Sequence, residues 1–208
     1  MLDRRTLFTG AGAAATLTAC SSRGGNPFSA RTLPATPRAA ALIAAARMQI
    51  GVTVTYDGGY TRIPFPGGDI PRERGACTDI LIRAYRDAFG IDLQALVHTD
   101  MMAAFAAYPK QWGLSAPDPN IDHRRVPNLA TWFDRHHAKL PIPADPADWR
   151  PGDIFTCRVS QNGTHIGMVS DRVGSRSPFI IHNYGAGARE QDMLPHLDMT
   201  GRFRWSVS

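Results

Sequence analysis

The sequence predicts an α+β fold in which helices come first and pack on an antiparallel β-sheet that follows. Over residues 39–137, apolar side chains recur mainly at helical intervals. After a proline-rich break at 140–151, they alternate with a period of two, as strands do. Separate helical and strand regions favour this class over alternating α/β units. A chain of 208 residues suits one domain with a short leader.

The predicted helices end at residues that stop helices. Gly51 and Gly90 follow the first two, and glycine readily adopts the left-handed conformation of a C-cap. Pro109 follows the third, where a ring without an N–H cannot continue the helix. The predicted helices are 39–50, 77–89, 100–108 and 129–137.

The predicted strands are separated by residues that form turns. Two stretches rich in glycine, proline and polar residues, 56–75 and 112–128, are predicted to be loops. A last, short strand is expected near the C-terminus. The predicted strands are 153–159, 165–171, 179–183 and 203–207.

The N-terminus has the pattern of a bacterial export signal. Arg4 and Arg5 precede an apolar stretch too short to span a bilayer, and that stretch ends at Cys20. The ending resembles a lipobox, whose cysteine carries a diacylglyceryl group. An ordinary cleaved signal with an incidental cysteine is the alternative. We therefore expect a signal peptide (1–19), a flexible tether (20–38) and a folded domain (39–208), anchored by lipid in the cell envelope and facing the periplasm.

The charge indicates the class of partner. The formal net charge is +5, carried mostly by arginine. A dispersed basic excess suits an anionic envelope surface. No arginine-rich run is interleaved with aromatic residues, so the sequence does not predict nucleic-acid binding.

Cys77 is the candidate nucleophile because it opens the helix predicted at 77–89. Unpaired backbone N–H groups in the first turn of a helix stabilise a thiolate and can bind an oxyanion. Position alone also fits a small buried core residue. Cys157 lies in a predicted strand on one face with Phe155 and Val159, and we expect it to pack in the core and remain unpaired with Cys77.

His165 is the candidate base. Strand alternation places His165, Gly167 and Val169 on one face, and Gly167 leaves space where the helix of Cys77 could approach. A residue on the next strand can fix the tautomer of the imidazole, and His182 suits that role. Asn183 replaces His182 if the register is shifted by one.

These residues carry a resemblance to the NlpC/p60 superfamily of cell-wall peptidases. The matching segments are Cys77 at the start of a helix, Trp149-Arg150-Pro151-Gly152-Asp153-Ile154, His165-Ile166-Gly167-Met168-Val169 and Ile181-His182-Asn183. The resemblance implies a papain-like fold with a Cys–His–polar triad that cleaves amide bonds in peptidoglycan stem peptides. Members place a tyrosine before the cysteine to bind the oxyanion, and Tyr60 is the candidate here, at a different spacing.

Four further segments carry a second, longer resemblance: Ile63-Pro64-Phe65-Pro66-Gly67-Gly68-Asp69, Cys77-Thr78-Asp79, Gly90-Ile91-Asp92-Leu93-Gln94 and the run from Asn120 to Asn128. They resemble the bacterial family called domain of unknown function 1287.

The polar run contains Asp122, His123, Arg124 and Arg125, which could bind a substrate carboxylate, since guanidinium groups bind carboxylates through two hydrogen bonds. A hydrogen-bonded loop that supports the sheet is the alternative. The histidines lack the spacing typical of zinc sites, so no metal and no cofactor are predicted.

The sequence thus predicts a lipid-anchored cysteine hydrolase in which Cys77 and His165 form a thiolate–imidazolium pair and cleave an amide bond in peptidoglycan. The rival hypothesis is a non-catalytic, lipid-anchored module that binds the cell wall with the same fold.

Overall fold

The computed structural model describes residues 31–161 and 163–206. The predicted signal peptide and the predicted lipidation site Cys20 lie outside these residues. Within them, every helix is too short or too polar to cross a membrane.

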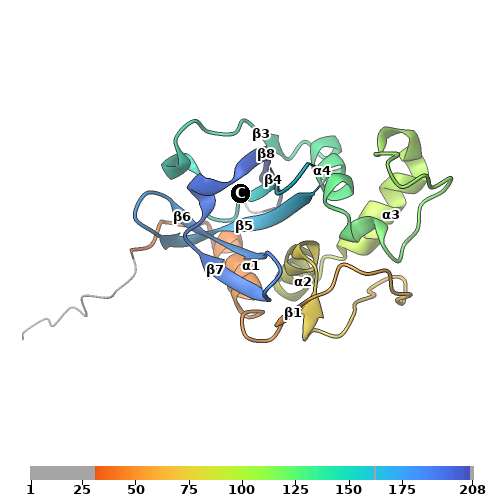
Figure 1. The fold of residues 1–208 in the computed structure, drawn as a ribbon, viewed down its shortest axis with the longest axis horizontal. Helices are drawn as coiled ribbons and strands as arrows, with labels where there is room; N and C mark the ends of the chain where they lie inside the picture. The colour runs from red at the N-terminus through yellow and green to blue at the C-terminus, as the bar shows by residue number, and fades with distance from the viewer. Residues whose placement is uncertain (1–30, 162, 207–208) are drawn as a thin grey trace, which may run out of the picture.

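The main sheet has six strands, and every neighbouring pair is antiparallel. Their order across the sheet is β3-β8-β4-β5-β6-β7, so β4, β5 and β6 lie near the centre (Figure 1). This arrangement confirms the α+β class. The strands are β3 (Lys139–Leu140), β4 (Ile154–Arg158), β5 (Thr164–Val173), β6 (Pro178–Asn183), β7 (Ala188–Gln191) and β8 (Asp198–Phe203).

Helices cover one face of this sheet. Ile166, Met168 and Ile181 point from β5 and β6 into a core shared with α1, α2 and α4, while α3 packs farther out against α2 and α4. Figure 1 shows α1 and α2 beside the sheet and α3 at the far end of the molecule. The helices in the described residues are α1 (Pro37–Arg47), α2 (Cys77–Phe89), α3 (Leu93–Ala104) and α4 (Val126–Arg135), with 3-10 turns η1 (Phe105–Ala107), η2 (Asp122–Arg124), η3 (Pro146–Asp148) and η4 (Leu194–His196).

The other face of the sheet carries a second, smaller core. Side chains from β4, β5 and β6 pack there against Trp149 and Leu194. Burial on both faces explains why these strands are almost continuously buried. The sheet residues in this second core are Phe155, Cys157, Val169 and Ile180.

The predicted bounds of α2 match the structure, whereas those of α3 and β8 were wrong. Helix α3 begins at Leu93 rather than at residue 100, because the Asp92 side chain accepts a hydrogen bond from Gln94 N at 3.1 Å and caps the helix. The last strand ends at Phe203 instead of beginning there. Strands β3 and β7 are too short or too polar to give a clear period of two.

Two short pairings lie outside the predicted elements. Strands β1 (Thr55–Tyr56) and β2 (Arg74–Gly75) form a parallel pair that closes the long loop before α2. In the segment expected to be a tether, Leu33 N donates to Asp171 O at 2.7 Å. Helix α1 begins at Pro37, two residues before Ala39. The last residues of the expected tether, from 31 to 38, therefore pack against the domain.

Candidate active site

Cys77 is the first residue of α2 and is almost fully buried, with 3% of its surface exposed. The Asp79 carboxylate accepts a hydrogen bond from Ala76 N at 2.6 Å, which fixes where the helix begins. In the first turn, Asp79 N donates to Ala76 O at 3.2 Å, while the N–H groups of Cys77 and Thr78 donate to the Tyr56 oxygen and the Cys77 sulfur. The thiol therefore lies at the positive end of the helix dipole.

The environment of the thiol favours its neutral form. Burial is the largest effect and raises the pKa of Cys77 above its usual value. The backbone N–H groups of Ile166 and Thr78 and the Tyr56 hydroxyl oppose this rise by donating hydrogen bonds to sulfur. In the resting structure, the candidate nucleophile is therefore a protonated thiol among donors that can stabilise a thiolate.

The tyrosine at the thiol is Tyr56, not Tyr60. Pairing of β1 with β2 places Tyr56 opposite Gly75, two residues before Cys77. Burial is the largest effect on the pKa of Tyr56, and the interaction with the Cys77 thiol is the second. Together they raise this pKa to about 12, so the phenol keeps its proton. The Tyr60 hydroxyl instead donates to Asp118 Oδ2 at 3.0 Å, and 59% of Tyr60 is exposed.

His165 and His182 belong to a directed hydrogen-bond chain. Nε2 of His165 lies 2.9 Å from Nδ1 of His182, and Nε2 of His182 lies 3.0 Å from Oε1 of Gln191. Because the Gln191 oxygen only accepts, Nε2 of neutral His182 carries the hydrogen and its Nδ1 holds a lone pair. That Nδ1 must accept from Nε2–H of His165. The lone pair of His165 is thereby left on Nδ1, where it can accept a proton.

Both imidazoles are neutral near pH 7. Burial is the largest effect on the pKa of His165 and the charge of neighbouring His182 is the second; together they lower it to about 3. Burial also lowers the pKa of His182, and the bond to Gln191 partly opposes this. The thiolate–imidazolium pair expected from the sequence is therefore not the resting state. Within the described residues no hydrogen bond joins His165 to Cys77, and such bonds in catalytic pairs often form only when substrate binds.

The expected role of Gly167 was wrong, although the expected strand faces are confirmed. Ile166 and Met168 face the helices, and Val169 faces the second core. A Cβ atom on Gly167 would lie 2.6 Å from the Phe155 ring and 2.9 Å from Cβ of His182. Gly167 thus makes room for Phe155 and His182, while α2 packs on the other face and reaches the start of β5 with its first residue.

Asn183 supports the site from the helical face. Its Nδ2 donates to Gly75 O at 2.8 Å, which ties β6 to the segment just before Cys77. Because successive strand residues point to opposite faces, Asn183 points away from the side occupied by His182. The structure therefore places His182, and not Asn183, beside His165.

Arg124 is a structural residue, since every guanidinium nitrogen is already bonded. Its Nε and Nη2 bind the Asp79 carboxylate at 3.0 and 2.8 Å. Its Nη1 and Nη2 also donate to the carbonyls of Gly59 and Asp57. Asp79 is thus held in a buried ion pair, although its charge still contributes to the raised pKa of Cys77. Four of the five N–H donors of Arg124 are thus used within the described residues, and the one left on Nη1 cannot bind a substrate carboxylate through two hydrogen bonds.

The other polar residues of this run also serve the loop. The Asp122 carboxylate accepts from Arg125 Nη1 at 2.9 Å and from a backbone N–H, and it is buried. His123 is buried, and burial lowers its pKa to about 3. The alternative interpretation of a hydrogen-bonded loop fits the contacts of Asp122 and Arg124. It does not fit His123, whose buried Nδ1 has no hydrogen-bond partner among the described residues, and Arg125 stays partly exposed.

Cys157 and Cys77 are both free thiols. Cys157 lies in the second core, and burial raises its pKa to about 12. Among the described residues, no hydrogen bond to the Cys157 sulfur opposes that rise, in contrast to Cys77. In the described residues, no three His, Cys, Asp or Glu side chains are grouped to hold a metal ion.

Comparison with known proteins identifies the family. The family described as "Domain of unknown function (DUF1287)" matches residues 43–205, which include the thiol and the whole histidine chain. The chain belongs to this family. It is also 50% identical over 163 residues to "Uncharacterized protein YijF" of Escherichia coli (strain K12), covering 78% of this chain and 79% of the relative.

Two residues of this DUF1287 site were missed by sequence reasoning. Tyr56 lies in a stretch predicted to be loop, and only its pairing with β2 brings it to Cys77. Gln191 follows a polar stretch with no alternation, so β7 gave no strand signal. The register of β6 with β7, which pairs His182 with Arg189, places Gln191 two residues beyond and on the same face.

Proposed function

We propose that this protein is a papain-like cysteine hydrolase of the NlpC/p60 type, which cleaves an amide bond in peptidoglycan stem peptides. One observation carries the proposal: the Gln191–His182–His165 chain leaves a lone pair on Nδ1 of His165. The backbone N–H of the next residue, Ile166, is directed at the Cys77 sulfur. The candidate base on β5 is thus next in sequence to the residue whose N–H contacts the candidate nucleophile on α2.

The reaction follows from the resting protonation states. As substrate binds, the Cys77 thiol transfers its proton to Nδ1 of His165 and sulfur attacks the amide carbonyl carbon. At rest the Cys77 N–H donates to the Tyr56 oxygen and the Tyr56 hydroxyl donates to the Cys77 sulfur. Both groups would turn to the oxyanion as it forms. The imidazolium then protonates the leaving amine, and a thioester remains on Cys77.

Hydrolysis completes the cycle. Neutral His165 takes a proton from water, and the resulting hydroxide attacks the thioester carbon. The carboxylic acid product leaves, and the thiolate of Cys77 recovers the proton from His165. The reaction needs no cofactor, because both proton transfers use the same imidazole.

The export signal and the lipidation at Cys20 that the sequence predicts support the proposal of an envelope substrate. They would hold the domain on the periplasmic side of a membrane, within reach of peptidoglycan. Peptidoglycan stems contain the amide bonds that this chemistry cleaves.

Digestion of purified peptidoglycan tests the proposal. We expect the protein to release stem-peptide fragments, identified by mass spectrometry, and Cys77→Ala to release none. Cys157→Ala is the matched control, since that thiol lies in the second core, and it should retain cleavage. Peptidoglycan that binds but stays intact with the unmodified protein would instead support the non-catalytic cell-wall module.

A further inference from the structure

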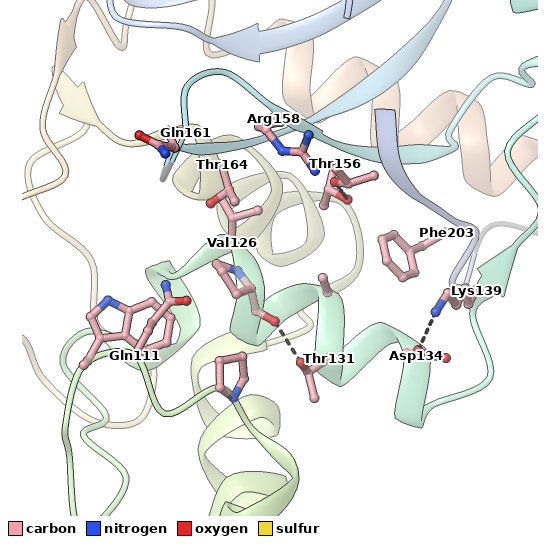
Figure 2. Close-up of a pocket in the computed structure, with 16 residues that line it drawn as sticks. Gln111, Val126, Thr131, Asp134, Lys139, Thr156, Arg158, Gln161, Thr164 and Phe203 are labelled. Carbon is pink, nitrogen blue, oxygen red and sulfur yellow. Dashed lines mark hydrogen bonds and ion pairs between the residues drawn. The ribbon is translucent and has the colours of Figure 1, made fainter. Parts of the chain in front are cut away.

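A groove of about 790 Å³ lies between α4 and the strands β4, β5 and β8. In Figure 2, Val126, Thr131 and Asp134 line it from the helix side, and Thr156, Arg158 and Thr164 line it from the sheet. The volume falls in the range of sites that bind small ligands. None of the catalytic candidates lines this groove.

Both walls of the groove begin close to the Cys77 thiol. On the sheet side, Thr164 is two residues before Ile166, whose N–H is directed at sulfur. Two strand residues span about 6.6 Å. On the helix side, Val126 is two residues after Arg124, whose carbonyl accepts from Thr78 Oγ1 at 3.1 Å. Each wall of the groove thus includes a residue two positions from one that contacts the first turn of α2.

The lining is rich in neutral hydrogen-bonding groups. In the described part of the chain, the side chains of Gln111, Gln161 and Thr164 have no hydrogen-bonding partner, so they are available to a ligand. Hydroxyl and amide groups both donate and accept. The neutral polar residues of the lining are Gln111, Thr131, Thr156, Gln161, Thr164 and Thr200.

The charged side chains in the groove are already paired. Lys139 Nζ lies 2.8 Å from Asp134 Oδ2, as Figure 2 shows. Arg158 Nη1 lies 3.1 Å from Asp198 Oδ2. Each cation is thus matched by a carboxylate, so these pairs give the groove little net charge to attract an anion. The lining therefore fits a neutral ligand better than an anionic peptide.

Trp112 provides an aromatic wall. Its indole lines the groove, and the Arg125 guanidinium stacks on it 4.2 Å from the ring centroid. The stacked arginine restrains the ring. Aromatic rings next to neutral hydrogen-bonding groups suit sugar rings, which have apolar C–H faces and polar edges.

We propose that this groove binds a neutral saccharide bearing hydroxyl and N-acyl amide groups, and so holds the glycan that carries the substrate amide. The inference rests on the proposed function for its biological setting. The glycan would bind in the groove while the amide that reacts lies at Cys77. Substrates with a glycan should therefore bind more tightly than free stem peptides.

Binding of the neutral tetramer of N-acetylglucosamine to the full chain tests this. With Cys77→Ala, which prevents turnover, we expect calorimetry to show binding. Trp112→Ala should weaken binding by at least about tenfold. Trp112→Phe should restore most of it, and Met102→Ala, exposed on α3 outside the groove, should leave it unchanged. Cellotetraose, which lacks the N-acyl amides, should bind more weakly.

The outcomes separate this proposal from the proposed function. Cleavage that depends on Cys77, with equal KM for glycan-linked and free stem peptides and no binding of the tetramer, would overturn the groove assignment alone. Binding of a free stem peptide that is lost in Trp112→Ala would make the groove a peptide site and overturn it too. Binding of the tetramer without any cleavage would support the groove and contradict the hydrolase.

Discussion

The imidazole of His165 obtains its tautomer from residues that lie far along the chain. Gln191 orients His182, and His182 orients His165, through bonds of 3.0 and 2.9 Å. Because burial keeps both rings neutral, the direction of these bonds decides which nitrogen can accept a proton. Gln191 is therefore a positioning residue.

Replacement of Gln191 by leucine should disturb that direction. Without its acceptor, His182 can carry its hydrogen on Nδ1, and Nε2 of His165 then becomes the acceptor. We expect kcat/KM to fall at least about tenfold, equivalent to ~1.4 kcal/mol, with little change in KM. Nitrogen NMR of the imidazoles should show a mixed tautomer in His165.

Gln191→Glu is the matched control because a carboxylate keeps the acceptor for His182 Nε2. It should retain the tautomer and most of the activity. A leucine variant that keeps both the original NMR signature and full activity would show that Gln191 does not position the base.

At the scale of elements, the start of α2 is joined to the loop in front of it by buried ions. The Asp79–Arg124 pair has side chains that are 4% and 3% exposed, and Arg124 also holds the carbonyls of Asp57 and Gly59. Arg83, fully buried on α2, binds Asp69 in the same loop. These contacts hold the segment that carries Tyr56 against Cys77.

Asp79→Ala should destabilise the protein by about 3–5 kcal/mol, because it leaves the Arg124 charge buried without a partner. Urea unfolding measures the loss. On the same helix, Asp87→Ala removes an exposed pair with Arg72 and should cost less than ~1 kcal/mol. Equal losses in the two variants would contradict a structural role for the buried pair.

Contact between β4, β5 and β6 also depends on one small residue. Gly167→Ala should overpack the space shared by Phe155 and His182 and cost about 1–3 kcal/mol. It should also lower activity by displacing His182. Phe155→Leu in the same chain should recover part of both losses, measured by thermal unfolding and peptide cleavage. A fully active, stable Gly167→Ala variant would show that this contact is not needed.

At the scale of the whole molecule, buried neutral histidines couple folding to pH. Burial holds the pKa of His123 and of His165 at about 3, and it lowers the pKa of His182 as well. An unfolded histidine titrates near ~6.5. Their stabilising contribution is thus complete above that pH and is lost as the pH falls towards 3, because only the unfolded chain binds these protons.

His123→Gln should therefore flatten the pH dependence of stability. Between pH 4 and 6, we expect the slope of the free energy of unfolding to fall by up to ~1.4 kcal/mol per pH unit, the value for one proton. Urea unfolding at several pH values measures it. An unchanged slope would mean that His123 is protonated in the folded protein.

The sequence by itself determined the fold class, the bounds of α2 and the strands that carry His165 and His182. Those features depend on local periodicity and on capping residues, which a short stretch of chain contains completely. Family membership likewise follows from the sequence, through the match over residues 43–205.

Only the tertiary structure decided which tyrosine contacts the thiol, what fixes the imidazole tautomer and which groups the Arg124 guanidinium binds. Tyr56 depends on the pairing of β1 with β2, and Gln191 depends on the register of β7. The bonds of Arg124 join segments that are 45 to 67 residues apart in the chain. Burial sets the charge state of Cys77 and His165, and burial depends on contacts between distant segments that no local pattern contains.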